Sequence, residues 1–518
     1  MGKSTNAYKI VSRDRRLHSF LQHPASMPNR LPNRRHVLTG LALTTGAALT
    51  RKLPALGLSE GAVARDPMRP QYHLLPRHGW MNDPCGPLFW KGRYHMFLQY
   101  NDEPVSAVKL WAHATSSDMV HWRREPIALA PIPGGPDAQG CWTGTAAIVD
   151  GKPTFLYTGV VNSTPEQATL ADSNPPLRES VCMAVAEDDT LLRWRKLPQP
   201  VIATPPAGMK VVGFRDPSPW REGDHWYLIV ASGERGAGGR VLLYRSADFR
   251  HWDYLHPMAQ GKPNGKQGTD PVDSGEMWEC PDFFPLDGKH VLIHSTERRT
   301  LWQIGTLDPA AMLFHAESEG LLDHGAYYAP KSQLDAHGNR ILWGWITETR
   351  PQAEYAAAGW SGMMSLPRRL SIANGTLVMA PAPEIESLRT APRTGSAVRR
   401  LPTAAQEIRL TLEPATTAAA FEQSFVDNQG AAVLLRANPQ QSPDTLRVGD
   451  QEISGIDKGP LDLQIFLDHS VAEIFINQRH TLTERYYTRT AMEPAVAITL
   501  GGNWRFTQQF AWSLKSIW

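Results

Sequence analysis

Short runs of alternating or continuous apolar residues, bounded by Gly, Pro and Asp, dominate the chain from about residue 66 onward. Runs of five to eight residues with turn residues between them are typical of β-strands. We expect strands over residues 94–100, 110–115, 154–159, 181–186, 225–232, 240–245, 290–295, 341–347, 461–467 and 471–476. Nothing between residues 66 and 518 has a strong helical pattern. The pattern therefore predicts an all-β protein.

A short motif that ends in Trp recurs along the first part of this region. Residues 117–122 (S-D-M-V-H-W) return as residues 247–252 (A-D-F-R-H-W), and a looser copy ends at Trp194. We interpret these three tryptophans as structural anchors between strands. A repeat of about 60–70 residues, with several strands in each copy, is typical of a β-propeller. Residues 66–390 would hold five such blades.

The last part of the chain has a different organisation. Residues 390–402 are rich in Pro, Thr, Arg and Ser and are interpreted as a linker. Alternating strands follow it. We therefore predict a second β domain over residues 403–518, most simply a β-sandwich.

The first 64 residues have the layout of an export signal. They carry ten Lys and Arg against two acidic residues, and Arg34-Arg35 stands directly before a weakly apolar run. Ala62-Val63-Ala64 then offers a small-residue cleavage site. This resembles a twin-arginine signal and predicts export to the periplasm or out of the cell. The true start is Met1 or Met27.

Composition excludes several classes of function. The remaining 454 residues carry 43 basic and 49 acidic side chains, which gives no electrostatic footprint for nucleic acid or anionic membrane. No segment is long and apolar enough to predict a membrane anchor. The four Cys are too few for a disulfide scaffold and lack zinc-site spacing, so we expect no metal.

Three acidic residues lie inside compact motifs that also contain Trp or Phe and Pro. The motifs are W-M-N-D-P at 80–84, F-R-D-P at 214–217 and W-E-C-P-D at 278–282. At the start of inner propeller strands, Asp83, Asp216 and Glu279 would project into a central channel. Carboxylates among aromatic rings are costly to desolvate and have tuned pKa values. Two carboxyl groups, one ionised and one protonated, are what glycoside cleavage requires.

Together with further segments in the same order, these motifs resemble glycoside hydrolase family 32, the invertases, inulinases and levanases. The further segments are Y-H-M-F-L-Q-Y at 94–100, W-A-H-A at 111–114, G-C-W-T-G-T-A at 140–146, G-W-S-G at 359–362, L-P-R at 366–368 and D-H-S-V-A-E-I-F-I-N at 468–477. The resemblance covers nearly all of the chain after the leader. It implies a five-bladed propeller, a β-sandwich behind it, and retaining hydrolysis of β-fructofuranosides.

Carried over by position, the resemblance also implies roles for single residues. Asp83 would be the nucleophile, Glu279 the acid/base, and Asp216 the residue that holds the fructose hydroxyls. No cofactor is implied. The substrate-binding residues would be Trp80, Asn82, Gln99, Trp111, Trp142, Thr143, Arg215, Asp323 and Trp360.

Two departures from the family pattern leave the acceptor open. Cys85 replaces the usual Asn and would reshape the pocket floor or the acceptor side. Asp323 is kept, but the Lys of an Asp-x-Gly-Lys pattern is replaced by Ala326, which weakens any preference for sucrose over fructans. A fructosyltransferase that uses the same intermediate is therefore an alternative, and a non-catalytic sugar-binding propeller is a remote one. Self-association through the sandwich is also open.

Overall fold

The computed structural model describes residues 60–105, 108–266, 270–395 and, with gaps, 398–518. In the last range the gaps are 399, 402–404, 415–420, 427–431, 438–444, 449–450, 457–458, 488–495 and 503. The predicted leader lies outside the described residues except for the short helix α1 (Glu60–Ala64).

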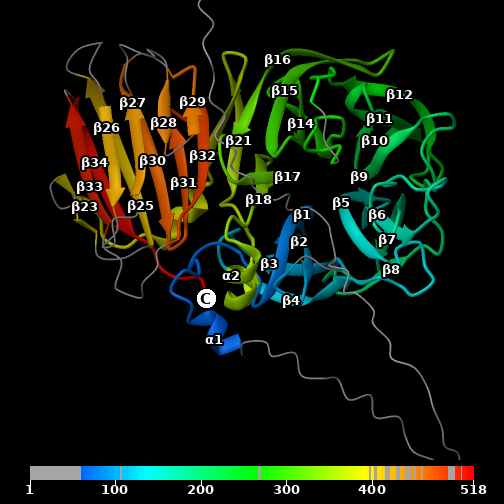
Figure 1. Ribbon diagram of the computed structural model, residues 1–518, viewed down its shortest axis with the longest axis horizontal. Helices are drawn as coiled ribbons and strands as arrows, with labels where there is room; N and C mark the ends of the chain where they lie inside the picture. The colour runs from blue at the N-terminus through cyan, green and yellow to red at the C-terminus, as the bar shows by residue number, and fades with distance from the viewer. Residues whose placement is uncertain are drawn as a thin grey trace, which may run out of the picture.

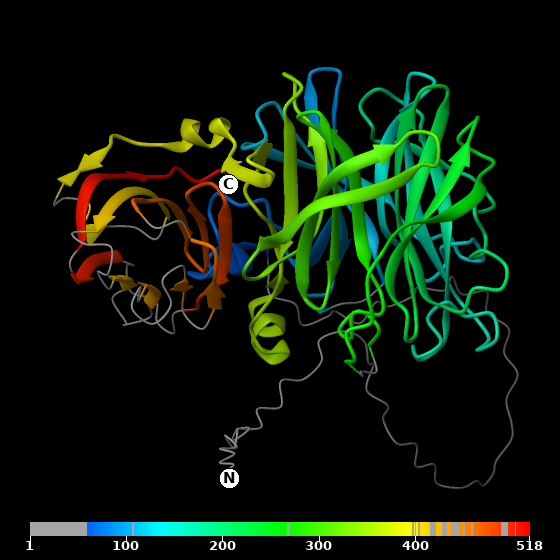
Figure 2. The same ribbon diagram turned by 90° about the horizontal axis from the view of Figure 1, so that it is seen from above.

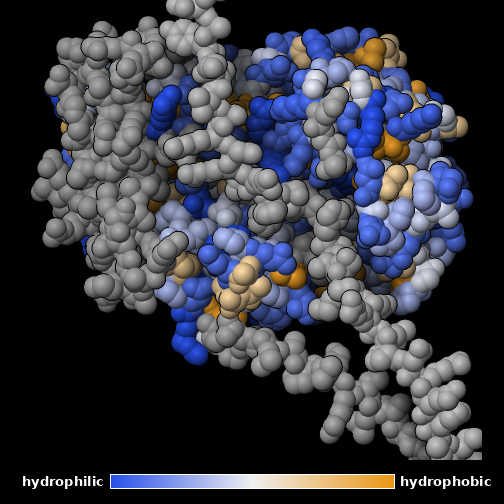
Figure 3. Space-filling model, viewed as in Figure 1, coloured by the Kyte–Doolittle hydropathy of each residue, from blue (hydrophilic) through white to orange (hydrophobic). Residues whose placement is uncertain are grey.

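Within the described ranges, no helix has the length and apolar character needed to cross a membrane. The coloured part of the face in Figure 3 is mostly hydrophilic, with hydrophobic residues in small scattered patches.

Five sheets follow one another between residues 79 and 381, and each consists mainly of consecutive antiparallel strands. The first contains β1 (Gly79–Trp90), β2 (Arg93–Asn101), β3 (Leu110–Ser116) and β4 (Trp122–Leu129). The second contains β5 (Gly140–Val149), β6 (Lys152–Asn162), β7 (Leu177–Ala186) and β8 (Trp194–Lys196). The third contains β9 (Val211–Glu222), β10 (His225–Glu234), β11 (Gly238–Ser246) and β12 (Asp253–Gln260).

The fourth and fifth sheets complete this part of the molecule. The fourth contains β13 (Glu279–Leu286), β14 (Lys289–Thr296), β15 (Arg299–Asp308) and β16 (Leu313–Asp323). The fifth contains β17 (Tyr327–Leu334), β18 (Arg340–Ile346), β20 (Met363–Met364), β21 (Arg368–Ala373) and β22 (Thr376–Pro381). After the helix α2 (Gln352–Ala358), the short strand β19 (Trp360–Ser361) pairs in parallel with β1. The chain thus ties the fifth sheet to the first.

The first strands of the five sheets surround a common centre. β1 contacts β5, β5 contacts β9, β9 contacts β13, β13 contacts β17, and β17 contacts β1. Figure 1 shows β1, β5, β9 and β17 near this centre, with β4, β8, β12 and β16 toward the outside. This radial arrangement fits a propeller. Nine of the ten strands expected from the sequence fall within observed strands, and the tenth, 341–347, extends one residue beyond β18.

The recurring Trp motif is a turn between the third and fourth strands of a sheet. In each copy an aspartate accepts hydrogen bonds from backbone amides two to four residues further on; the aspartates are Asp118, Asp188 and Asp248. The residue after the aspartate, or one close behind it, has φ near +60°. Trp122 and Trp194 each donate to the backbone carbonyl three residues earlier, which confirms them as anchors.

A fourth copy of the same turn, between β15 and β16, has no Trp and therefore escaped the sequence pattern. Asp308 accepts hydrogen bonds from the amides of Ala310 and Ala311, and Met312 has φ +54°.

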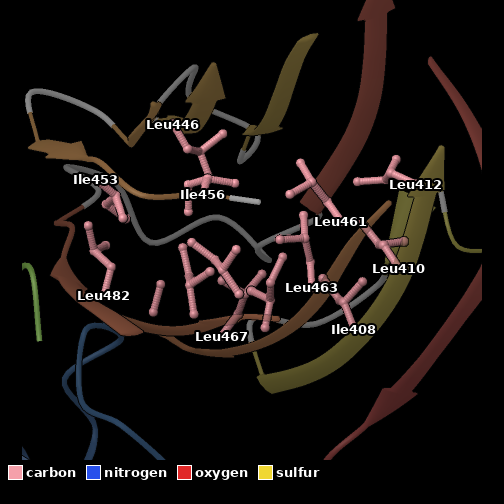
Figure 4. Packing of buried hydrophobic residues seen from close by; sticks show 14 of the residues in the cluster. Ile408, Leu410, Leu412, Leu446, Ile453, Ile456, Leu461, Leu463, Leu467 and Leu482 are labelled. Carbon is pink, nitrogen blue, oxygen red and sulfur yellow. The ribbon is translucent and has the colours of Figure 1, made fainter. Parts of the chain in front are cut away.

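The C-terminal part is a pair of six-stranded antiparallel sheets. One contains, in spatial order, β23 (Arg393–Thr394), β34 (Trp504–Ser513), β25 (Ala405–Pro414), β30 (Leu461–Asp468), β31 (Val471–Ile476) and β32 (His480–Arg485). The other contains β24 (Arg400–Leu401), β33 (Val496–Gly502), β26 (Phe421–Val426), β27 (Ala432–Ala437), β28 (Leu446–Val448) and β29 (Gln451–Ile453). Aliphatic side chains from both sheets, among them Leu446, Ile453, Leu463 and Leu482, meet between them (Figure 4). This packing fits the predicted sandwich.

The predicted linker is more ordered than its composition indicates. β23 pairs with β34 and β24 pairs with β33, so this segment contributes an edge strand to each sandwich sheet. Such pairing uses backbone groups, which the composition of a Pro- and Ser-containing stretch does not reveal. The 3₁₀ helix η1 (Pro383–Leu388) precedes it.

A buried cluster of charges joins the sandwich to the five-sheet part, which lie side by side in Figures 1 and 2. Arg368 of β21 donates to Glu473 of β31 at 2.7 Å and to Asp323 of β16 at 2.9 Å. His73 contacts Asp468 at 2.7 Å and Glu473 at 3.0 Å. Burial lowers the pKa of His73, but these two carboxylates raise it to about 9. The cluster therefore balances buried charges across the boundary between the two parts.

We expect Arg368→Leu to lower the free energy of unfolding by about 3–5 kcal/mol, because it leaves the buried Asp323 without a cation and Glu473 with His73 alone. Arg369→Leu is the matched control, since Arg369 is the exposed neighbour on the same strand, and it should change stability by less than about 0.5 kcal/mol. Urea unfolding followed by Trp fluorescence measures both. Equal stability of the two variants would contradict the role given to the cluster.

Candidate active site

The first strand of every sheet around the centre is interrupted near its beginning. The pairing register shifts after Met81 in β1, after Trp142 in β5, after Arg215 in β9, after Glu279 in β13 and after Tyr328 in β17. A bulge of this kind bends the strand and re-aims its side chains. Pro follows the bulge in four strands, where no ladder amide is needed: Pro84, Pro217, Pro281 and Pro330.

The fifth interruption uses Gly144 in place of Pro. A Cβ atom at this position would lie 2.1 Å from the carbonyl oxygen of Leu156, so only glycine permits the close approach of β5 to β6. The bulge residues Asp216, Cys280 and Ala329 have φ values of +60°, +50° and +51°. These positive φ values set side-chain directions that regular strand geometry would not allow.

The interruptions bring three acidic side chains together from three different sheets. The Cys280 Sγ atom lies 3.5 Å from Asp83 Oδ2 and 3.5 Å from Asp216 Oδ2. Arg215 Nη2 donates to Glu279 Oε1 at 2.8 Å, and Arg215 Nε lies 4.0 Å from Asp216 Oδ2. Asp83, Asp216 and Glu279 thus share one set of neighbours at the centre of the ring.

Asp83 is held by donors on both carboxylate oxygens. Thr143 Oγ1 donates to Oδ2 at 2.5 Å, and Asn82 Nδ2 donates to Oδ1 at 3.1 Å. Burial raises the pKa of Asp83, and the hydrogen bonds from Thr143, Asn82 and Cys280 oppose this rise. The carboxylate is oriented by these bonds and stays partly exposed at the centre.

A chain of amide and hydroxyl groups fixes these donors in turn. Trp80 Nε1 donates to Asn82 Oδ1 at 3.0 Å, and Asn82 Nδ2 donates to Gln99 Oε1 at 2.8 Å. Gln99 Nε2 donates to Thr143 Oγ1 at 2.5 Å. The Thr143 hydroxyl therefore accepts from Gln99 and donates its own proton to Asp83. Each group in this chain donates a hydrogen bond to the next, so the chain fixes the orientation of the Asp83 carboxylate.

Glu279 has different partners. Arg215 Nη2 and Nε both donate to Oε1, at 2.8 Å and 3.2 Å, while the Tyr328 hydroxyl donates to Oε2 at 2.7 Å. The Glu279 side chain is 15% exposed, so part of it can reach a ligand. Its position at the first residue of β13 directs it from the fourth sheet toward the centre.

Asp216 is the most deeply buried of the three carboxylates, with 2% of its surface exposed. Burial raises its pKa to about 7; Arg215 opposes the rise, whereas the negative charges of Glu279 and Asp83 add to it. The backbone amide of Cys280 donates to Asp216 Oδ2 at 2.8 Å. Closely spaced carboxylates therefore hold a proton at this centre near neutral pH.

Sequence reasoning missed two residues in the surroundings of these carboxylates. Burial lowers the pKa of Lys109 to about 7, against the opposing charge of Asp83, and its Nζ atom lies 5.1 Å from the centroid of the Trp80 ring. Tyr328 of β17 donates to Glu279, and nothing in its local sequence indicated this bond. A lysine or tyrosine beside an apolar strand carries no signal of such a partner, because the partner comes from another strand: Asp83 lies in β1 and Glu279 in β13.

Three residues predicted to bind substrate, Trp111, Trp360 and Asp323, are held by partners inside the fold. Trp111 and Trp360 expose no surface; Trp111 Nε1 donates to the Trp142 carbonyl at 3.1 Å and Trp360 Nε1 to Asp66 at 2.7 Å. Asp323 accepts hydrogen bonds from Arg368 and from Thr483 of the sandwich. Internal partners satisfy these three side chains, whereas Trp142 remains partly exposed.

Cys85, which was expected to reshape the pocket floor or the acceptor side, lies in the core. Its side chain is fully buried in a cluster with Leu88, Phe97 and Cys141, and its Sγ atom faces the carbonyl oxygen of Asp83 at 3.5 Å. All four cysteines are unpaired and buried. In the part of the chain that the structure describes, no group of three or more His, Cys, Asp or Glu could hold a metal ion.

Comparison with known families gives two matches that together span most of the chain. The model described as "Glycosyl hydrolases family 32 N-terminal domain" matches residues 73–381, and the one described as "Glycosyl hydrolases family 32 C terminal" matches residues 385–513.

Individual relatives agree with these matches. The chain is 35% identical to a sucrose-6-phosphate hydrolase of Escherichia coli over 79% of this chain and 87% of that protein. It is 33% identical to a raffinose invertase of Escherichia coli over 86% of this chain and 95% of that protein. Among solved structures it is similar to a GH32 β-fructofuranosidase variant of Bombyx mori in complex with sucrose, with a TM-score of 0.72, 26% identity and coverage of 88% and 96% of the two chains.

We expect Asp216→Asn to make the protein more stable than the wild type above about pH 7, by on the order of 2 kcal/mol. The folded-state pKa of Asp216 lies above its ordinary value, so its protonation stabilises the fold at low pH and this contribution is lost as pH rises through about 7. The advantage of the variant should therefore vanish near pH 4. Urea unfolding at pH 4 to 8 measures it, with the exposed Asp224→Asn as control; a constant difference across pH would contradict the assignment.

Proposed function

Because this chain belongs to glycosyl hydrolase family 32, we propose that it is a β-fructofuranosidase that releases terminal fructosyl residues from sucrose or fructans. Two comparisons support this proposal: the relative named raffinose invertase and the Bombyx mori enzyme solved in complex with sucrose. The observation that carries it is the convergence of Asp83, Asp216 and Glu279 from three sheets, with Arg215 bound to Glu279.

The roles proposed for the carboxylates follow from their contacts. Asp83, oriented by Thr143 and Asn82, attacks the anomeric carbon of fructose and forms a covalent ester. Glu279 gives its proton to the oxygen of the breaking glycosidic bond, and the first product leaves. Water then attacks the same carbon, Glu279 takes its proton, and the bond to Asp83 breaks. The configuration at the anomeric carbon is retained, as two displacements require.

Asp216 and Arg215 surround the reacting centre without forming a bond to it. Asp216 accepts hydrogen bonds from fructose hydroxyls, and these bonds strengthen as positive charge develops on the ring. Trp142 supplies an apolar face for ring C–H groups. Trp80, Asn82, Gln99 and Thr143 act mainly by orienting Asp83, while Trp111, Trp360 and Asp323 support the site from within the fold.

Hydrolysis is proposed in preference to fructosyl transfer. Cys85 was the residue that pointed to a transferase, and its side chain exposes no surface and packs into the core. A sugar-binding protein without activity would be expected to lack one of the acids, and all three are present.

The proposal extends to the architecture. We take each of the five sheets as one propeller blade, the propeller as residues 66–390 and the sandwich as residues 403–518. The contacts around the ring and the parallel pairing of β19 with β1 support five blades.

We expect Asp83→Ala and Glu279→Ala to fold normally and to lose fructose release by several orders of magnitude, because each removes a group that bonds or gives a proton to the reacting atoms. Chromatography of the products from sucrose, sucrose 6-phosphate, raffinose, inulin and levan measures the loss and ranks the substrates. Asp224→Asn, at an exposed turn, is the control and should retain activity.

Free fructose as the main product at high sucrose concentration would support the hydrolase. Glucose with fructo-oligosaccharides and little fructose would identify a transferase. No turnover of any substrate by the wild type would overturn the proposed function.

We also propose that the chain is exported by its leader, with Arg34-Arg35 as the recognised pair. Replacing both by Lys should keep the enzyme in the cell, because a receptor reads this pair as an address. The control replaces Arg15-Arg16, a second arginine pair in the same leader, and should leave export unchanged. Fractionation followed by an activity assay measures both; equal export of the two variants would contradict the proposal.

A further inference from the structure

A fourth carboxylate, Glu179 of β7, lies next to the site without touching the other three. It exposes no surface and belongs to the second sheet. Its Oε1 accepts a hydrogen bond from Arg215 Nη1 at 2.9 Å, and its Oε2 accepts from the backbone amide of Phe214 at 2.6 Å and from Thr169 Oγ1 at 3.0 Å. These three donors stabilise a buried ionised carboxylate.

Arg215 is divided between two acidic residues. Nη1 points to Glu179, while Nη2 and Nε point to Glu279. A guanidinium is planar and rigid, so fixing one edge fixes the direction of the others. A Cβ atom at Gly213 would lie 2.6 Å from Arg215 Nη1, so the chain leaves room for the guanidinium in this place.

We propose that Glu179 is a positioning residue for the acid–base step: through Arg215 it fixes the place of Glu279 and limits the positive charge that acts on it. The inference rests on the proposed function, because it requires Glu279 to be the acid/base. Glu179 itself touches neither substrate nor reacting atoms. Its role is to keep Arg215 from pairing with Glu279 alone.

The charges around Glu279 give the sign of the expected effect. Arg215 and the Tyr328 hydroxyl contact its carboxylate, Asp216 and Cys280 adjoin it, and Asp270 acts on it through space. Removing the negative charge of Glu179 leaves the charge of Arg215 less compensated, which favours the ionised form of Glu279. Glu279 would then be a poorer acid.

The test compares Glu179→Gln and Glu179→Asp with the wild type. We expect Glu179→Gln to move the alkaline limb of the kcat profile to lower pH by about 0.5–1 unit. Glu179→Asp keeps the negative charge on a shorter side chain, so the alkaline limb of its kcat profile should stay near that of the wild type. The matched control is Glu473→Gln, which removes a buried partner of Arg368 at the boundary with the sandwich and should leave the limb in place.

A second substrate separates positioning from loss of structure. Sucrose has a poor leaving group and needs the proton of Glu279, whereas an aryl β-fructofuranoside with an acidic phenol does not. Glu179→Gln should therefore lose roughly tenfold or more in kcat/KM on sucrose and only about threefold or less on the aryl substrate. A structural defect would lower both equally.

The inference is overturned if the pH profile of Glu179→Gln superimposes on that of the wild type and both substrates lose activity equally. If Glu179→Gln does not fold, the ratio of the two substrates in Glu179→Asp decides: a larger loss on sucrose supports positioning, and equal losses overturn it. Failure of the proposed function is a separate result, because the wild type would then release no fructose from sucrose.

Discussion

Like charges close together and out of water are the constraint on which the centre of this protein depends. Asp83, Asp216 and Glu279 meet there, and Glu179 lies directly behind them. Four carboxylates in this space repel one another unless cations, donors or a bound proton compensate them. Arg215 contributes the main compensation because its planar fork reaches two of them at once. Burial, together with the charges of Glu279 and Asp83, still raises the pKa of Asp216 to about 7 against the opposing charge of Arg215.

The fold supplies the geometry that this balance needs. Asp83, Asp216 and Glu279 each come from the interrupted first strand of a different sheet, and the neighbouring strand of each sheet pairs with that first strand along most of its length. Ordinary strand geometry would send alternate side chains up and down within one sheet. The bulges in β1, β9 and β13 re-aim these side chains toward the centre.

The sandwich stabilises the ring from outside. Its charged cluster around Arg368 and Glu473 is as buried as the active-site cluster, but oppositely charged partners surround every member. Asp323, which sequence reasoning assigned to the substrate, is part of this cluster. The same residue type therefore serves stability in one cluster and chemistry in the other, and the balance of charge around it makes the difference.

By itself, the sequence determined the strand-rich character, the repeat, the order of the motifs and the three acidic residues that meet at the centre, because periodicity and local motifs are written along the chain. It did not reveal the inner strands, since Pro and bulges break their pattern. Tertiary structure alone decided that Cys85 and Trp111 face the core, and that Glu179, Lys109 and Tyr328 adjoin the carboxylates. The reason is physical: each of these environments is made by side chains from other elements, and a pKa or a buried contact depends on spatial neighbours that lie far apart in the chain.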